Sequence, residues 1–409
     1  MGKQAREASR LIAESSLSLR NKALFAIVQD LRRRRTLILK ENRRDIEFAR
    51  NKGLSSAFLD RLRLNNARVE KMIEMVMEVK KLPEPLGKIL WEIKRPNGLL
   101  IKRISVPIGV IGIIYESRPD VTVQAAALCL KAGNCIILKG GKEAYNSNLV
   151  LVNILQGAIR RCNLPESTVQ IVRSTERKAV KYVLSLNNYL DLIIPRGGES
   201  LIKMVSDNSR VPVIKHYKGI CHTYVGKRAD LKKAISVTFN AKMQRPGTCN
   251  STETLLVHQK IARLFLPKII KKLKTAGCEI HGCQRTLKVY PGIKRAKKKD
   301  WDTEYLAPIL SVKVVDSLKE AIEHINLYGT GHSDTIITED KRAAAEFLKK
   351  VDSAAVYLNA STRFTDGNEF GLGAEMGIST DKIHARGPMG LQSLTSYKYI
   401  IYGNGQVRE

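Results

Sequence analysis

Between residues 106 and 226, short apolar segments alternate with helical segments, and this alternation restricts the fold more than any other feature of the chain. Because strands that are followed by helices form parallel sheets covered by those helices, the pattern predicts an α/β domain whose ligands bind beyond the carboxyl ends of the strands. The predicted strands are 108–115, 134–140, 168–172, 190–195 and 221–225, and the predicted helices are 121–132, 147–161, 176–186 and 199–208.

A second alternating region runs from about residue 230 to residue 365. It contains apolar segments such as ETLLVH, LSVKVV and DTIITED, separated by helical segments such as KIARLFLPKIIKKLKTAG. The pattern predicts a second α/β domain. The tail from residue 366 is rich in glycine and ends with SYKYIIYG, which is typical of a strand.

The region before the first domain is helical and then changes character. Apolar residues at three- and four-residue spacing predict helices between residues 4 and 83, which end at the proline-rich LPEPLG. Two apolar-basic segments then flank Asn97-Gly98, a strong signal for a β-hairpin. Because this hairpin carries several apolar residues that look exposed, we expect a partner subunit to cover it.

The net charge of the 409 residues is +31, which raises the question of nucleic-acid binding. The charge is spread along the chain, and the densest runs, LRRRR and KRAKKKD, are not interleaved with aromatic residues. This distribution favours a solvated basic surface that attracts small anions over a specific nucleic-acid site. No apolar run is long enough to span a membrane and the N-terminus has no apolar signal core, so we expect a cytoplasmic protein.

The seven cysteines are scattered and odd in number, which does not indicate a disulfide framework. Cys278, His281 and Cys283 in CEIHGC lack a distant fourth ligand, so we expect no metal site. Cys249 differs from the others because it follows a Pro-Gly-Thr turn and precedes a predicted strand. Backbone N–H groups in such a loop can stabilise a thiolate, but the residues alone leave open whether Cys249 is a nucleophile or a small buried residue.

Two glycine turns, LKGGKE (138–143) and IPRGGES (194–200), each follow a predicted strand and precede a predicted helix. Glycine permits close backbone approach, and a helix N-terminus attracts phosphate, so the pair indicates a dinucleotide site with Lys139 and Arg196 as cationic contacts. The usual P-loop and G-x-G-x-x-G fingerprints are absent. The polar, glycine-rich segment 359–390 predicts either a binding loop or a subunit contact.

These segments together resemble the gamma-glutamyl phosphate reductases (glutamate-5-semialdehyde dehydrogenases) of the aldehyde dehydrogenase superfamily. The resemblance covers most of residues 10–405 in order. It is carried by VPIGVIGIIYESRPDVTVQAAALCLKAGNCIILKGGKEA, DLIIPRGG, VPVIKHYKGICHTYV, NAKMQRPGTCNSTETLLVH, DSLKEAIEHINLYGTGHSDTIITED and VDSAAVYLNASTRFTDGNEFGLGAEMGISTDKIHARGPMGLQSLTSYKY.

The resemblance implies an aldehyde dehydrogenase-like fold with two α/β domains and a small β oligomerisation element, in a homo-oligomer. The implied cofactor-binding domain comprises residues 1–87 and 106–229, the catalytic domain residues 230–386, and the oligomerisation element residues 88–105 and 387–409. The implied reaction is the NADPH-dependent reduction of L-glutamyl 5-phosphate to L-glutamate 5-semialdehyde, the second step of proline synthesis from glutamate. It also implies functional coupling to a separate glutamate 5-kinase.

The resemblance assigns Cys249 as the catalytic cysteine, whose thiolate expels phosphate and forms a thioester that hydride resolves. It places Lys139 at the adenosine ribose, Arg196, Gly197 and Gly198 near the pyrophosphate, and Glu304 at the nicotinamide ribose, and it counts Gly140 among the cofactor contacts. The substrate side of the cleft takes Arg363 and Arg386, together with Arg118 and His384.

The resemblance also places Asp120 among the catalytic residues, at a position where many relatives have asparagine as an amide donor to the oxyanion. A carboxylate donates only when protonated, so Asp120 departs from the family pattern. Two further readings remain open beside the reductase. One is a basic protein on this scaffold that binds polyanions without turnover. The other is an enzyme for a different acyl phosphate or an acyl-CoA.

Overall fold

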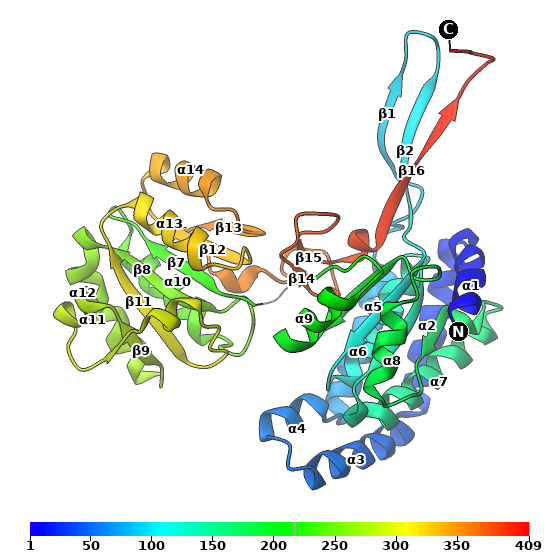
Figure 1. Cartoon of the computed structure of the whole chain (residues 1–409), viewed down its shortest axis with the longest axis horizontal. Coiled ribbons are helices and arrows are strands. Elements are labelled where there is room, and N and C mark those ends of the chain that lie inside the picture. Colours follow the sequence, from blue (N-terminus) through cyan, green and yellow to red (C-terminus); the bar gives the residue numbers. More distant parts are fainter. Residues whose placement is uncertain (216–217, 409) are drawn as a thin grey trace. The chain divides into compact units, whose positions relative to one another are not determined.

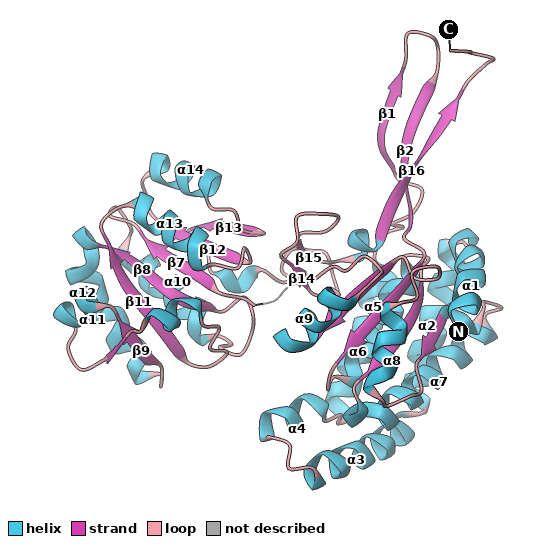
Figure 2. Cartoon of the chain, in the orientation of Figure 1, coloured by secondary structure: helices cyan, strands magenta, loops and turns pink. Residues whose placement is uncertain are grey.

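The computed structural model describes residues 1–215 and 218–408. His216 and Tyr217, in the segment VPVIKHYKGICHTYV, and the terminal Glu409 therefore lie outside the described residues. The chain forms two compact units, which we call unit 1 (Met1–Lys215, Gly371–Gly377, Met389–Glu409) and unit 2 (His216–Phe370, Ile378–Pro388) (Figure 1). The predicted aldehyde dehydrogenase-like fold with two α/β regions is confirmed (Figure 2).

Unit 1 begins with five helices, as the sequence predicts for residues 4–83. Three of the five have a serine or asparagine side chain, at Ser16, Ser55 or Asn65, that accepts a backbone N–H of the first turn and so fixes where the helix begins. The helices are α1 (Gly2–Glu14), α2 (Leu17–Arg33), α3 (Arg35–Asn51), α4 (Ser56–Leu62) and α5 (Asn66–Lys81).

The four-stranded sheet of unit 1 is parallel, with the order β5-β4-β3-β6. Its strands are almost entirely buried, since helices cover a parallel sheet on its faces. The strands of this sheet and the helices that follow them are β3 (Val110–Tyr115), α6 (Pro119–Lys131), β4 (Cys135–Gly140), η1 (Lys142–Ala144), α7 (Tyr145–Arg161), η2 (Glu166–Thr168), β5 (Val169–Ile171), α8 (Arg177–Leu184), β6 (Leu192–Arg196) and α9 (Glu199–Asn208).

Unit 2 contains a seven-stranded parallel sheet with the order β10-β9-β11-β8-β7-β12-β13. Its elements are β7 (Cys221–Val225), α10 (Leu231–Met243), β8 (Thr252–His258), α11 (Gln259–Thr275), β9 (Glu279–Gly282), α12 (Gln284–Val289), β10 (Lys294–Arg295), η3 (Lys298–Asp302), β11 (Ile309–Val315), α13 (Leu318–Tyr328), β12 (Ser333–Ile337), α14 (Lys341–Lys350), β13 (Ala355–Leu358), η4 (Thr362–Phe364), β14 (Ile378–Ser379) and β15 (Gly387–Pro388).

One grouping of strands predicted from the sequence is wrong. The segment 221–225 was expected in the first sheet, but β7 pairs with β8 and β12 in the sheet of unit 2. Local alternation identifies a strand without identifying its neighbours, because strand pairing depends on contacts distant in sequence. The functional domain boundaries remain predictions, since compact packing does not reveal which residues hold a cofactor or a partner.

A three-stranded antiparallel sheet extends from the rest of unit 1 (Figure 1). It consists of β1 (Ile89–Lys94), β2 (Leu100–Pro107) and, after η5 (Leu391–Leu394), β16 (Thr395–Tyr402). The predicted hairpin at Asn97-Gly98 is confirmed, and Gly98 adopts the left-handed conformation at φ 90° that the turn needs. Among the described residues, no helix is both long and apolar enough to cross a bilayer.

Candidate active site

All of the residues predicted for the cofactor except Glu304 lie at the carboxyl edge of the four-stranded sheet in unit 1. Tyr115, the last residue of β3, is in register with Gly140 of β4 on one side and with Arg196 of β6 on the other. Parallel strands end together, so the two glycine turns of the sequence lie at the same edge, on either side of the end of β3.

Lys139 is buried at this edge, and its Nζ donates to the Gly140 carbonyl at 2.9 Å. Burial lowers the pKa of Lys139, while the nearby Glu143 carboxylate opposes the effect. A side chain at Gly140 would collide with the Asn148 amide. Glycine is therefore required here for close packing between β4 and α7.

The helix N-termini at both turns are occupied by carboxylates. Asp45 accepts the backbone N–H groups of Asn146 (3.1 Å) and Ser147 (2.7 Å) at the start of α7. Glu116, directly after β3, accepts the N–H of Gly198 at 2.9 Å at the start of α9. Neither carboxylate was predicted, because each comes from another part of the chain. The sequence carries a signal for Glu116, which is an acidic residue directly after a predicted strand.

Arg118 and Asp120 lie in the turn between β3 and α6, and both are exposed. Arg118 is the residue before the helix and Asp120 is in its first turn. Between Glu116 and Arg118, Ser117 has φ 49°, an uncommon conformation for a non-glycine residue, and its N and Oγ donate to Glu143 at 3.1 Å. The turn is thus held by a carboxylate at the same sheet edge.

In unit 2, Cys249 lies on the loop between α10 and β8, which we call the nucleophile loop (residues 244–251). Five of the seven cysteines are buried, whereas Cys249 and Cys283 are partly exposed. A turn bond from Ser251 N–H to the Thr248 carbonyl (3.0 Å) shapes the loop around Cys249. The buried Cys221 thiol donates to the Cys249 carbonyl at 3.2 Å, which fixes the backbone of the residue.

Arg363 lies beside the nucleophile loop. Its Nε donates to Gln244 Oε1 at 2.9 Å, and its guanidinium interacts electrostatically with Cys249. Burial, followed by repulsion from Arg245, lowers the pKa of Arg363. Asn250 fastens the segment around Arg363 to the loop, because its Nδ2 donates to the Thr365 carbonyl at 2.8 Å.

Glu304 reaches the same region from the segment before β11. Its Oε1 accepts the Gly219 N–H at 2.9 Å. A Cβ on Gly219 would overlap the Cys249 carbonyl, so Gly219 packs directly on the nucleophile loop. The structure therefore brings together Cys249, Arg363 and Glu304, which are far apart in the sequence.

Arg386 and His384 lie in the segment between β14 and β15. The guanidinium of Arg386 binds Asp352, with an Nη2–Oδ1 distance of 2.8 Å and a second bond to the Asp352 carbonyl at 3.0 Å. His384 is exposed and has φ 68°. Arg386 thus has a carboxylate partner within the protein, whereas Arg363 lies beside Cys249.

Sequence reasoning also missed the ion pair between Lys242 and Glu253, which are both fully buried. Lysine and glutamate are rarely buried, and these two lie on either side of the nucleophile loop in the sequence. The signal that could have found them is a pair of opposite charges at the ends of the loop. No group of side chains with metal-ligand character occurs among the described residues.

Comparison with known proteins identifies relatives over the whole length. The model of the aldehyde dehydrogenase family matches residues 1–300 and 281–400. Gamma-glutamyl phosphate reductases of Carboxydothermus hydrogenoformans and Thermodesulfovibrio yellowstonii are 54% and 52% identical, covering all of this chain and 98% and 97% of theirs. The crystal structure of the gamma-glutamyl phosphate reductase of Thermotoga maritima matches with a TM-score of 0.98 at 48% identity, covering 100% of this chain and 99% of that one.

Proposed function

We propose, from the premise that the chain belongs to the gamma-glutamyl phosphate reductase family of oxidoreductases, that it reduces L-glutamyl 5-phosphate to L-glutamate 5-semialdehyde with NADPH in proline biosynthesis. The observation that carries the proposal is the partly exposed Cys249 on its fixed loop, beside the Arg363 guanidinium. A cation near a thiol favours the thiolate, which is the nucleophilic form.

In the proposed reaction, Cys249 Sγ attacks the acyl carbon of the substrate. The bond from this carbon to the phosphate oxygen breaks, and phosphate leaves with the electron pair, which produces a thioester on Cys249. When bound, NADPH supplies the hydride that reduces this carbonyl carbon. The C–S bond then breaks, the aldehyde leaves and the thiolate is restored. Hydride rather than water resolves the thioester, so no general base for water is required.

The cofactor edge of unit 1 suits an anionic dinucleotide. The cations of Lys139 and Arg196 lie near the ends of β4 and β6, on either side of β3, and Gly140, Gly197 and Gly198 belong to the two glycine turns at these strand ends. In unit 2, the carboxylate of Glu304 is suited to accept ribose hydroxyl protons. We propose these six residues as the cofactor contacts.

Arg363 is the proposed partner of the substrate phosphate or carboxylate, because it is half-buried beside Cys249. Arg118, His384 and Arg386 are kept as further substrate contacts, although Arg386 would have to leave Asp352 to serve. Asp120 lies in the first turn of α6, where an ionised carboxylate would accept rather than donate. We keep Asp120 as a proposed catalytic residue, which would donate to an oxyanion only if its carboxyl group were protonated.

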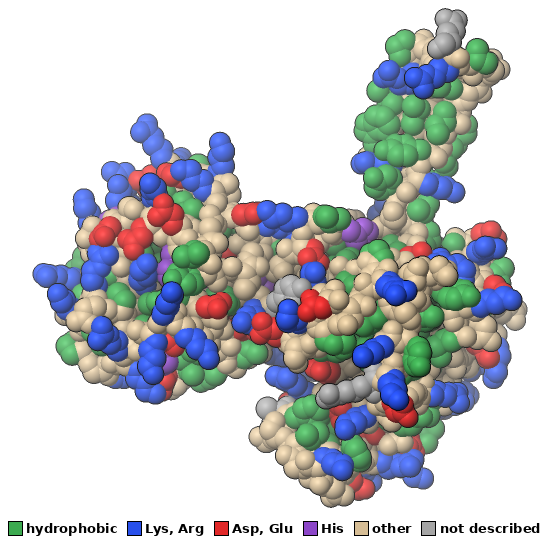
Figure 3. Space-filling view, in the orientation of Figure 1, with side chains coloured by type: hydrophobic (Ala, Val, Ile, Leu, Met, Phe, Trp, Pro, Cys, Tyr) green, Lys and Arg blue, Asp and Glu red, His purple; other side chains and the backbone are tan. Residues whose placement is uncertain are grey.

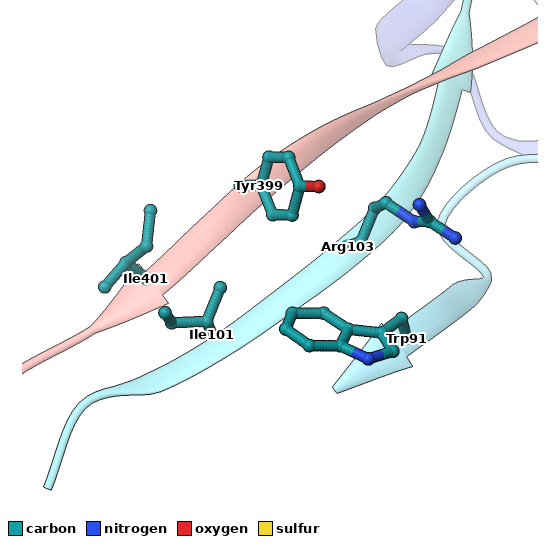
Figure 4. Close-up of a pocket in the computed structure, with 5 residues that line it drawn as sticks. All are labelled: Trp91, Ile101, Arg103, Tyr399 and Ile401. Atoms are coloured by element: carbon teal, nitrogen blue, oxygen red, sulfur yellow. The ribbon is translucent and has the colours of Figure 1, made fainter. Parts of the chain in front are cut away.

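Surface properties support a small anionic substrate and a homo-oligomer. On the face in Figure 3, Lys and Arg side chains are scattered and mixed with acidic ones. The three-stranded sheet carries a hollow lined by Trp91, Ile101, Arg103, Tyr399 and Ile401 (Figure 4). We propose that another copy of the chain covers this apolar face.

A cytoplasmic location and functional coupling to a separate glutamate 5-kinase complete the proposal.

The direct test runs the reaction in reverse, with glutamate 5-semialdehyde, phosphate and NADP⁺, while absorbance at the NADPH band is followed. We expect reduction of NADP⁺ that depends on phosphate and is slower with NAD⁺. Oxidation of related aldehydes without phosphate dependence would overturn the substrate assignment. Retention on DNA at low salt, with no turnover, would favour a polyanion-binding protein.

A further inference from the structure

We infer that the buried ion pair between Lys242 and Glu253 positions both Cys249 and Glu304, so that one pair of charges sets the geometry of the nucleophile and of a cofactor contact. The inference rests on the proposed function only in the roles of Cys249 and Glu304. Lys242 and Glu253 would be positioning residues, which act through the loop and not on substrate.

The pair closes the base of the nucleophile loop. Lys242 is in the last turn of α10 and Glu253 is the second residue of β8, so the loop (244–251) lies between them. Lys242 Nζ lies 2.6 Å from Glu253 Oε2, and neither side chain is exposed. A charge-assisted hydrogen bond in a low-dielectric interior is strong and directional, so it fixes the separation of the loop ends.

The other oxygen of the same carboxylate holds the segment of Glu304. Glu253 Oε1 accepts the Leu306 N–H at 3.3 Å, and Lys242 Nζ lies 5.9 Å from the centre of the Tyr305 ring. Leu306 has φ 51°, which is unusual for a bulky residue and needs surrounding contacts to hold it. Glu304 immediately precedes these two residues, so its position follows from theirs.

Contacts farther along the segment make the coupling specific. The Tyr305 hydroxyl donates to Asp300 Oδ1 at 2.9 Å and lies 2.8 Å from Ser311 Oγ. Glu304 Oε1 in turn accepts the Gly219 N–H, and Gly219 packs on the Cys249 carbonyl. A closed circuit of contacts therefore runs from the ion pair through Leu306, Glu304 and Gly219 back to Cys249.

Stability alone is a poor reason for such a pair. Two apolar side chains of similar volume stabilise an interior as well as a buried ion pair does, because the charges lose their hydration. Burial raises the pKa of Glu253 to about 7, and the Lys242 charge opposes this rise. What apolar side chains cannot supply is the directional acceptor for Leu306 and the fixed distance across the loop.

The test compares Glu253→Gln and the double variant Lys242→Met/Glu253→Leu with the wild-type chain. The rate at which iodoacetamide alkylates Cys249 is measured by mass spectrometry, with the partly exposed Cys283 of the same molecule as the internal reference. We expect the rate at Cys249 relative to Cys283 to fall at least fivefold in both variants, since the thiol moves away from Arg363. We expect kcat to fall at least tenfold with KM changed less than threefold.

Leu273→Ala is the matched control, because Leu273 is buried in the apolar core of unit 2 and is not part of the circuit. We expect it to lower the thermal midpoint and leave the Cys249 rate unchanged. If the double variant regains the wild-type midpoint, alkylation rate and kcat, the pair is purely structural and the inference is wrong. If a variant fails to fold, Glu253→Asp, which keeps the charge and shortens the reach, replaces it with the same expected losses.

The two proposals fail in different ways. A wild-type Cys249 that is alkylated no faster than Cys283 would contradict the proposed nucleophile, whatever the variants do. A reactive Cys249 whose rate is unaffected by Glu253→Gln and by the double variant would contradict the positioning role alone.

Discussion

The two units carry their candidate site residues at opposite edges of their sheets. In unit 1, Gly140 and Arg196 are at the carboxyl ends of β4 and β6, where α/β sheets usually bind ligands. In unit 2, Cys249 precedes β8 and Glu304 precedes β11, so both are at the amino ends of their strands. The general rule for parallel sheets therefore locates the candidate residues of unit 1 and would mislead for those of unit 2.

The two regions are also held in different ways. At the edge in unit 1, Glu116 caps α9 and is exposed, so a ligand can replace it. In unit 2, the loop of Cys249 is closed by two fully buried charges. We therefore expect the proposed cofactor edge to adapt on binding and the proposed nucleophile to be preorganised. Four further predictions would break or sharpen this contrast.

The largest effect is expected from Cys249→Ala. Removal of the nucleophile should lower kcat by roughly 10⁴-fold or more, since the remaining groups cannot form the thioester. Cys283→Ala is the control: its thiol is partly exposed too but bonds to Thr286 Oγ1 at 3.3 Å, and it should retain nearly full activity. Comparable turnover of Cys249→Ala and the wild-type chain in the reverse assay would remove Cys249 from the chemistry.

The next effect separates Arg363 from Arg386, the two arginines of unit 2 that are proposed as substrate contacts. Arg363→Met should lower kcat/KM by about 10²-fold, which corresponds to about 3 kcal/mol of lost charge-assisted contact. Arg386→Met should change it less than about threefold, because Arg386 already binds Asp352 and exposed ion pairs contribute little. Steady-state kinetics with varied glutamate 5-semialdehyde measures kcat/KM for both variants. A larger loss of kcat/KM in Arg386→Met than in Arg363→Met would make Arg386 the substrate contact.

The sequence predicted much of this architecture because the relevant signals are local. Strand β4 and helix α9 follow from apolar runs and three- to four-residue spacing, and Cys249 stands out through the turn before it. The sheet to which β7 belongs could not be predicted, since its neighbours β8 and β12 are distant in the sequence.

The partners of the site residues were the least predictable. Glu116 reaches Gly198 across 82 positions, and Arg386 reaches Asp352 across 34. The Lys242–Glu253 pair is closer, at 11 positions, but its burial depends on the packing of α10 against β8. Charged residues are expected at the surface, so composition argues against such pairs until the fold is known.

A third prediction concerns a buried lysine of unit 1 that, unlike Lys242, bonds to neutral acceptors. Lys131 Nζ donates to Asn21 Oδ1 and to the Lys80 carbonyl, both at 2.8 Å. Burial lowers the pKa of Lys131 from 10.5 to about 8, against the attraction of Glu84. The unfolded chain therefore binds more protons between pH 8 and 10.5, and the free energy of unfolding should rise with pH in that window.

The rise is measured against Lys131→Met, which lacks the group, by urea unfolding at pH 7.5, 9 and 10.5. We expect the wild-type chain to gain about 1–3 kcal/mol relative to the variant across this range. A difference that stays constant with pH would mean that Lys131 keeps its ordinary pKa when folded.

The smallest effect tests whether the cofactor edge adapts. Glu116→Gln keeps an oxygen that can accept the Gly198 N–H but removes the negative charge at the start of α9. A phosphate would then meet less repulsion at this helix N-terminus, and the effect of one charge there is about 0.3–1 kcal/mol. We expect the KM for NADP⁺ to fall about two- to fivefold, with kcat unchanged.

Glu166→Gln is the matched control for this change, because Glu166 is an acidic residue of the same unit that pairs with Arg160 and lies outside the candidate site. It alters the net charge equally, so any general effect of charge on the binding of the dinucleotide would appear in both variants. An increase in KM for Glu116→Gln alone would show that the carboxylate contributes to the bound state, for example by holding a ribose hydroxyl. The edge in unit 1 would then be preorganised like the nucleophile loop, and the contrast between the two units would disappear.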